Sequence, residues 1–190
     1  VVAIDPDLDR LRVAGALLPA DLTTNVTLVE APAENLAEIA DDSIDFVYSN
    51  YVLHWVSDKD RAMAELRRCL RSGGRIAVEC VGTLATLLTE LCAVAGEPGQ
   101  RRLARFHCLS KDGWKALFEG AGFVVDHIDW PEVPFEFTNL ETLVYWWEGT
   151  THGDVLRTNM ADATMDGLRA RYPARVHFSA PSLQLLAHKV

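Results

Sequence analysis

Hydrophobic positions along the chain alternate between short apolar runs, typical of buried strands, and segments in which apolar residues recur every three or four positions. The runs of the first half predict four strands, over Val1–Ile4, Val26–Glu30, Ile44–Ser49 and Arg75–Val81. A helical pattern separates the last two, with an apolar face formed by Ala62, Leu66, Cys69 and Leu70. Strand, helix and strand over about forty residues form a βαβ unit, so parallel strands are expected.

Capping and turn residues predict where these elements begin and end. Ser57 is expected to cap the helix of the βαβ unit. Gly73-Gly74 is expected to end that helix, because glycine accepts the left-handed conformation that often follows a helix. An earlier helix is expected over Leu8–Leu18, directly after the first strand.

The second half continues the α/β pattern and contains more aromatic residues. Thr83 is expected to cap a helix that breaks at 96–99, and Ser110 and Asn139 are expected to cap two more. The helix capped by Thr83 is expected over Leu84–Val94. The elements expected after it are a strand over Phe123–Ile128, an aromatic connection over Trp130–Phe137, a helix over Gly153–Tyr172 and a final strand over Ser182–Lys189.

Composition and charge narrow the classes of function. The length of 190 residues suits a single domain, and 49% hydrophobic with 24% charged residues is an ordinary globular balance. The net charge of -9 argues against a nucleic-acid partner, which would require clustered Lys and Arg. No apolar run is long enough to cross a bilayer and no signal peptide is evident, so we expect a cytoplasmic protein without a membrane partner.

Cysteine and histidine spacing gives no sign of a metal site. None of the four cysteines forms a CxxC pair, and the six histidines are scattered. This pattern favours reduced core cysteines over disulfides or metal ligands.

Polar and aromatic residues gather directly after the third predicted strand. They are Ser49, Asn50, Tyr51, His54 and Trp55. Ligands of open α/β sheets bind beyond the carboxyl ends of the strands, so this segment is expected at the mouth of a site. The alternative is that the aromatic residues only cover the end of the sheet.

Several segments together resemble the class I S-adenosylmethionine-dependent methyltransferases. They are IDFVYSNYVLHWV, the following helix, SGGRIAVE and the late EGAGF. The resemblance covers nearly the whole chain. The LHWV motif is similar to the one found in small-molecule carboxyl O-methyltransferases of the trans-aconitate and juvenile-hormone-acid types. It implies a Rossmann-like α/β sheet, mostly parallel with an antiparallel last strand. It also implies S-adenosylmethionine as cofactor and a small-molecule methyl acceptor, a carboxylic acid in the nearest types.

The resemblance implies a set of cofactor-binding residues. Asp5, followed by Pro6, takes the place of the acid that binds both ribose hydroxyls. From composition alone, Asp5 could instead be a turn residue or a helix cap. The loop that often reads GDAENL reads APAENL here, so Pro32 replaces the acid that meets the adenine. Ala33 and Glu34 remain as adenine candidates, and Glu34 could instead begin a short helix. Ser49 and Asn50 complete the expected cofactor set.

For the acceptor, the resemblance favours His54 and Trp55 as the catalytic pair, with Tyr51 and Trp130 as further substrate contacts. His54 is expected either to act as a base on a hydroxyl or, with Trp55, to orient a carboxylate. Residues 96–115 and 130–172 are expected as insertions that cover the substrate. Within the first of them, the basic run of Arg101, Arg102 and Arg105 favours a solvated helix face over a clamp for an anionic substrate.

The family's sheet begins with a strand and a GxGxG loop, and no such loop precedes Asp5. We therefore expect an N-terminally truncated chain. The family's strand order, 3-2-1-4-5-7-6, then predicts either a gap or a forced pairing between the first and third strands of this sequence. Two alternatives to an active methyltransferase stay open: a catalytically dead binding or interaction subunit, and a nicotinamide-dependent Rossmann oxidoreductase.

Overall fold

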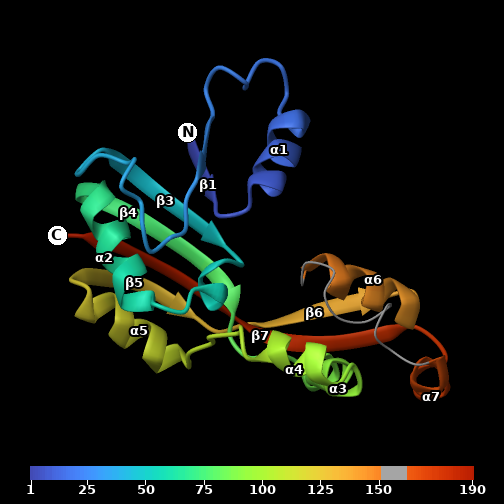
Figure 1. Cartoon of the computed structure of the whole chain (residues 1–190). Coiled ribbons are helices and arrows are strands. Elements are labelled where there is room, and N and C mark those ends of the chain that lie inside the picture. The colour runs from blue at the N-terminus through green and yellow to red at the C-terminus, as the bar shows by residue number, and fades with distance from the viewer. Residues whose placement is uncertain (151–161) are drawn as a thin grey trace.

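The computed structural model describes residues 1–150 and 162–190, which form two sheets and their covering helices (Figure 1). Strands β1 (Val2–Asp5) and β2 (Thr27–Glu30) make a two-stranded sheet. The larger sheet has the order β3-β4-β7-β5, with β6 paired to β7. Its strands are β3 (Ile44–Asn50), β4 (Leu70–Val81), β5 (Phe123–Asp129), β6 (Glu132–Phe137) and β7 (Val176–Lys189).

The strand directions confirm the expected α/β architecture. β1 runs parallel to β2, and β3 runs parallel to β4. β7 runs antiparallel to β4, β5 and β6, as expected for the last strand. β1 and β3 are not paired in the described residues, so of the two outcomes expected there the structure has the gap.

The helix of the βαβ unit begins and ends at other residues than predicted. Helix α2 (Lys59–Cys69) is capped by Asp58, whose carboxylate accepts from the Arg61 amide, and not by Ser57. Gly73-Gly74 does not end it, because the backbone is already extended at Leu70, where β4 starts. The pairing of β3 with β4 shifts register between Leu70 and Arg75, so the glycine pair serves a bulge, with Gly73 at φ 72°.

Helices elsewhere follow their predicted caps more closely. Ser110 caps α5 (Lys111–Gly120) by accepting from the Gly113 amide, whereas α1 (Leu8–Leu17) is capped by Asp7, which was not predicted as a cap. Asn139 accepts from the Thr142 amide at the start of α6 (Leu140–Thr150). By contrast, α3 (Thr86–Val94) begins two residues later than predicted and has no side-chain cap.

One prediction for the second half is wrong, and another holds only in part. The segment expected as an aromatic connection contains β6, because Pro134 is tolerated in a strand that pairs on one side only. The expected break at 96–99 is limited to Gly96, at φ 67°, and α4 (Glu97–Leu103) starts directly after it. Gly99 packs onto α3 so closely that an added Cβ would lie 1.8 Å from the Cys92 carbonyl oxygen. Of the helix expected over Gly153–Tyr172, the described part is α7 (Asp162–Arg171), and 153–161 lie outside the described residues.

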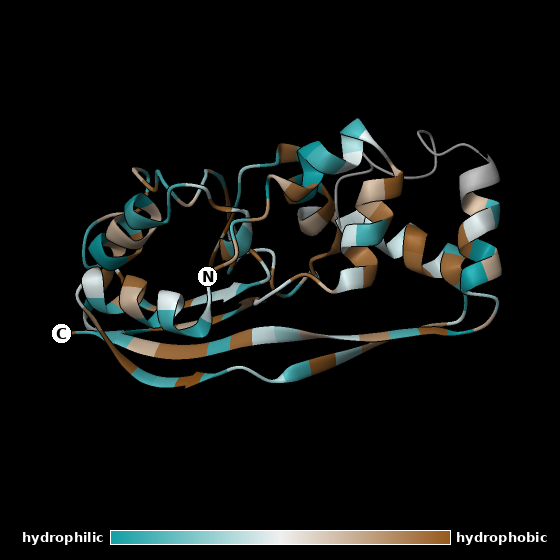
Figure 2. Ribbon diagram, turned by 90° about the horizontal axis from the view of Figure 1, so that it is seen from below, coloured by the Kyte–Doolittle hydropathy of each residue, from teal (hydrophilic) through white to brown (hydrophobic). Residues whose placement is uncertain are grey.

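Strand β7 passes through both hydrophobic cores of the molecule. Its outer half, with Val176 and Ala180, belongs to a core built with α3, α6 and α7. Its inner half, with Leu183 and Leu185, belongs to the core under α2 and α5. Figure 1 shows α3, α4, α6 and α7 gathered around the outer part of the long β6–β7 ribbon. These helices carry both hydrophobic and hydrophilic segments in Figure 2, as expected for helices that cover one core.

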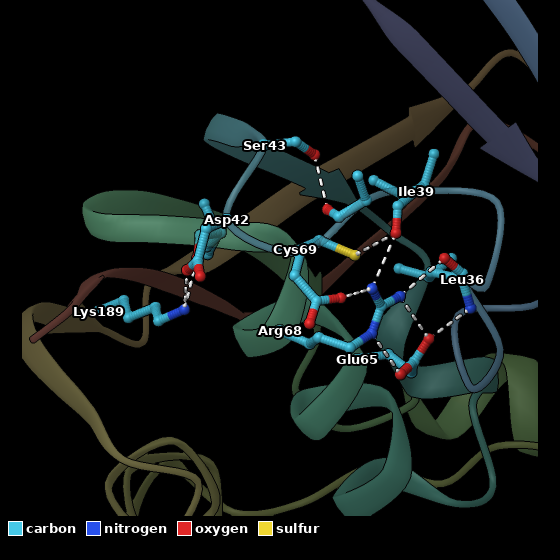
Figure 3. A network of polar contacts seen from close by, with 11 residues as sticks. Leu36, Ile39, Asp42, Ser43, Glu65, Arg68, Cys69 and Lys189 are labelled. Carbon is cyan, nitrogen blue, oxygen red and sulfur yellow. Dashed lines mark hydrogen bonds and ion pairs between the residues drawn. The ribbon is translucent and has the colours of Figure 1, made fainter.

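A polar network fastens the loop between β2 and β3 onto α2 (Figure 3). Arg68 donates to the Leu36 and Ile39 carbonyl oxygens, both at 2.8 Å, and to the Glu65 carboxylate. Glu65 also accepts a hydrogen bond from the Leu36 amide at 2.7 Å, and Asp41 accepts one from Arg68 at 2.5 Å. The hydrogen bonds from Arg68 lower the pKa of Glu65. The loop that carries Ala33 and Glu34 is thus held, beyond Glu34, by the side chains of Arg68 and Glu65.

We expect Arg68→Met to lower the melting temperature by a few degrees, because it releases two backbone carbonyls and leaves Glu65 without its cation. Arg71→Met is the matched control. Arg71 forms one ion pair with Asp45, and both side chains are more than half exposed, so its loss should hardly change the melting temperature. Differential scanning fluorimetry of both variants checks this, and equal shifts would show that the network does not stabilise the fold.

Candidate functional site

The predicted cofactor residues lie where the parallel strands end. Asp5 is the last residue of β1, and Pro6 follows it. Glu30 ends β2 opposite Asp5, and the Ala31 amide donates to the Asp5 carbonyl at 3.3 Å, so the two strand ends lie side by side. Ala33 and Glu34 follow two residues later, in a turn closed from the Asn35 amide to the Pro32 carbonyl at 3.0 Å and not in the alternative short helix.

The Asp5 carboxylate takes part in the local turn that leads into α1. Its Oδ1 accepts from the Asp7 amide at 2.8 Å, which places the carboxylate at the entrance to α1. The side chain is half-buried. The turn role considered from composition is therefore present, and it also fixes the direction of the carboxylate.

Ser49 and Asn50 end β3, in the other sheet. The Ser49 side chain is buried, and its hydroxyl has no hydrogen-bond partner among the described residues, whereas Asn50 is exposed. Tyr51 follows with φ at 53°, an uncommon conformation for a bulky residue. Its amide donates to the Glu79 carbonyl at 2.7 Å, and its hydroxyl lies 2.9 Å from Ser182 Oγ. These bonds join the end of β3 to β4 and β7.

His54 and Trp55 lie together in the short 3₁₀ helix η1 (Leu53–Trp55), at the head of an aromatic column. The His54 ring stacks on Phe106 with centroids 5.6 Å apart and planes 9° apart. Phe106 lies 4.0 Å from the Trp55 ring and stacks on Trp147 at 5.9 Å. The column therefore connects the site segment of the first core with α6 of the second.

The environment of His54 determines its protonation. The side chain is 2% exposed, and Nδ1 is buried without a hydrogen-bond partner in the described part of the chain. Burial, and then the positive charge of Lys59, lower the pKa of His54 to about 4. The imidazole is therefore neutral at pH 7 and can donate one N–H.

Lys59 links the two groups of predicted residues electrostatically. Its ammonium donates to the Val56 carbonyl at 2.6 Å and lies 5.5 Å from the Trp114 ring. Burial lowers the pKa of Lys59, and the Glu34 carboxylate is among the charges that oppose this shift. The same lysine acts on His54, so the adenine candidate and the acceptor candidate share one charged neighbour.

Trp130 lies at the end of β4 and not in the aromatic column. An added Cβ at Gly82 would lie 2.4 Å from its ring, so the indole covers the glycine that follows the strand. The structure thus brings Tyr51, His54 and Trp55 together, and places Trp130 against the neighbouring strand end.

Sequence reasoning missed Phe106 and misjudged Arg102. Arg102 is 2% exposed, and its guanidinium carbon lies 4.6 Å from the Trp55 ring centroid, so the interpretation as a solvated face is wrong for this residue. It holds for Arg101, whose side chain is 63% exposed and pairs with Glu97. Helix α4 has seven residues, of which two are arginines and one is leucine, and so short a pattern does not predict which arginine points inward.

Comparisons with known proteins agree with this architecture. Residues 1–78 match the profile of a family described as a methyltransferase domain. An uncharacterized methyltransferase of Schizosaccharomyces pombe is 32% identical over 143 residues, which cover 68% of this chain and 52% of that protein. A malonyl-[acyl-carrier protein] O-methyltransferase of Methylococcus capsulatus is 44% identical over 71 residues, which cover 36% of this chain and 26% of that protein.

Among solved structures, an S-adenosylmethionine dependent methyltransferase from Mesorhizobium loti superposes with a TM-score of 0.58 at 17% identity, over 100% of this chain and 80% of that one. The fold is therefore the Rossmann-like methyltransferase fold. Three of these proteins are described as methyltransferases, and one of the three as S-adenosylmethionine dependent. The chain spans about half the length of the yeast relative and about a quarter of the Methylococcus one.

The described residues, 1–150 and 162–190, also bear on membrane and metal partners. None of the helices in these ranges is long and apolar enough to cross a membrane. The same ranges contain no group of three or more His, Cys, Asp or Glu arranged to hold a metal ion.

The depressed pKa of His54 predicts a pH dependence of stability. Between about pH 6.5 and 4 the unfolded histidine binds a proton that the folded one does not, so the free energy of unfolding falls as the pH falls. From pH 7 to pH 5 this contribution amounts to about 2 kcal/mol. Urea unfolding of the protein and of His54→Gln at both pH values measures it. Equal pH dependence of the two proteins would contradict the buried neutral state.

Proposed function

We propose that the protein transfers a methyl group to the carboxylate of a small-molecule acid, at the aromatic column headed by His54 and Trp55. The observation that supports this most strongly is the buried, neutral imidazole directly after a central strand. The similarity to a malonyl-[acyl-carrier protein] O-methyltransferase, 44% identical over 71 residues, supports a carboxyl acceptor.

The cofactor side of the proposal rests on Asp5. S-adenosylmethionine, when bound, supplies a methyl group already activated on a sulfonium. The half-buried Asp5 carboxylate, at the end of β1, has the chemistry to accept hydrogen bonds from two neighbouring ribose hydroxyls. Glu34 and the Ala33 backbone follow the adjacent strand, on the side proposed for the adenine.

The acceptor side rests on what a neutral histidine can do. A carboxylate is nucleophilic at neutral pH, so its methylation requires no base and releases no proton. With a pKa of about 4, His54 is a weak base for a hydroxyl but a suitable single donor to a carboxylate. The protein then accelerates the reaction by holding the acceptor in line and excluding water.

The same residues leave open the alternative of a catalytically dead binding subunit. Binding and turnover therefore have to be measured separately. Calorimetry with S-adenosylhomocysteine reports binding, and radiolabelled methyl transfer to a panel of acids, alcohols and amines reports turnover. Binding without transfer to any acceptor would support the alternative and overturn the proposal. Competition by nicotinamide cofactors would favour the oxidoreductase reading instead.

We expect Asp5→Ala to weaken the binding of S-adenosylhomocysteine by about 1.5–3 kcal/mol, the range for hydrogen bonds to a charged group. Asp9→Ala, an exposed carboxylate in the first turn of α1, is the control and should leave the affinity unchanged. Isothermal titration calorimetry compares the three proteins. An unaltered affinity of Asp5→Ala would remove Asp5 from the site.

His54→Gln distinguishes the two roles considered for the imidazole. Because glutamine keeps an N–H donor, we expect the variant to retain much of the rate with a carboxylate acceptor. With a hydroxyl acceptor the loss should be roughly a hundredfold or more, since a general base is then required. Trp55→Phe keeps the bulk but loses the indole donor, and so tests hydrogen bonding apart from packing. If neither substitution alters the turnover of any accepted substrate, the pair is structural.

A further inference from the structure

A groove of about 580 Å³ lies between helices α2 and α5, which Figure 1 shows on the same side of the larger sheet. It is lined by α2 and by the C-terminal end of α5, through Asp60, Ala64, Arg67, Arg68, Gly120 and Ala121. None of these residues belongs to the candidate site, so the groove is a separate feature of the surface.

Two opposite charges line this groove without a strong partner of their own. The Asp60 carboxylate is exposed, and within residues 1–150 and 162–190 it forms no ion pair. In the same ranges the half-buried Arg67 guanidinium donates one long hydrogen bond, 3.4 Å from Nε to the Gly122 carbonyl oxygen. Arg68, by contrast, is engaged by the polar network of Figure 3. One carboxylate and one guanidinium are therefore available to a partner.

The order of residues along the groove makes α2 complementary to a second copy of itself. Asp60, Ala64 and Arg67 share one face of the helix, because they are spaced at i, i+4 and i+7. The charged residues lie about 10.5 Å apart along the axis, with the alanine between them. When the helix is turned end for end, this face presents arginine where it had aspartate. A second α2 laid antiparallel across the first therefore places each Asp60 opposite the Arg67 of the other copy.

Small residues leave room for this approach. The Ala64 side chain ends at Cβ and is exposed, so it lets two helix axes come close where they cross. The opposite wall of the groove contains Gly120, at which an added Cβ would meet nothing within 4 Å. Side chains of a second helix therefore have space between α2 and α5.

The polar character of this face determines how strongly two copies can associate. The apolar residues of α2, among them Met63 and Leu66, are buried in the first core and are not available to a partner. The net charge of -9 on each copy opposes their approach. Association therefore depends on the specific pairing of opposite charges, and exposed ion pairs contribute little each.

We propose that this groove is an interface between two copies of the chain, in which the α2 helices cross antiparallel and Asp60 of each copy pairs with Arg67 of the other. The interface is isologous, so both ion pairs form together about one two-fold axis. Another protein would have to present the same charges in reversed order, whereas a second copy does so by symmetry. We expect a concentration-dependent dimer and not an obligate one. The inference does not depend on the proposed function.

Analytical ultracentrifugation tests the interface by exchanging its charges. At about 0.15 M salt the mass of the parent should rise from 21.0 kDa towards twice that value as its concentration rises from about 10 µM to about 1 mM. Asp60→Arg alone and Arg67→Glu alone should each associate about 10- to 100-fold more weakly, because like charges then meet at both ends. An equimolar mixture of the two variants should regain the association of the parent, since unlike chains restore both pairs.

Asp9→Arg and Arg101→Glu are the matched controls, because they make the same changes of net charge at exposed positions of α1 and α4. Both should associate as the parent does. A parent that stays monomeric at the highest concentration would overturn the proposal, and so would equal weakening in the controls or a mixture that does not regain association. If a groove variant does not fold, Ala64→Arg carries the comparison. Its bulk at the crossing should abolish the dimer, and unchanged association would overturn the proposal.

Discussion

The pairing of β7 with three other strands is the constraint on which the rest of the structure depends. Residues 184–188 pair with β4 on one side and β5 on the other, and residues 176–181 pair with β6, so every residue of the strand from 176 to 189 has a partner strand on at least one side. Its inward side chains enter both hydrophobic cores. This strand thus fixes the position of the outer helices, with Trp147 on α6, relative to the sheet that leads into Tyr51 and His54.

This arrangement explains why the His54 imidazole has an unusual protonation state. Ser182 of β7 meets the Tyr51 hydroxyl and holds the segment after β3, while Phe106 closes over His54 from the other core. Water is removed from the imidazole, and its pKa falls to about 4. The neutral state on which the proposed acceptor chemistry depends is therefore a consequence of packing between two cores.

Much of the fold could be predicted from the sequence because its signals are local. Apolar runs predicted the four parallel strands, and Ser110 and Asn139 capped the expected helices. The bulge at Gly73 and the strand through Pro134 could not be predicted, because both depend on a partner strand far away in the chain. The pairing of β7 along 14 residues is likewise a tertiary effect.

The candidate site was predictable in part for the same reason. Tyr51, His54 and Trp55 follow a recognisable strand and were expected at its end, and they lie together there. Arg102 and Phe106 join them from a segment about fifty residues further along the chain, and the helix that carries Arg102 is too short to show which of its faces is buried. Trp130 was expected with the acceptor residues, but its ring lies over Gly82, a contact that only the fold creates.

A crystal structure of the protein with S-adenosylhomocysteine bound tests the central claim most directly, since it locates the ligand without relying on turnover. The account predicts that the ribose hydroxyls lie within hydrogen-bonding distance of the Asp5 carboxylate and that the sulfur faces the segment of His54 and Trp55. A ligand whose ribose contacts other residues, or whose sulfur points away from the aromatic column, would contradict it.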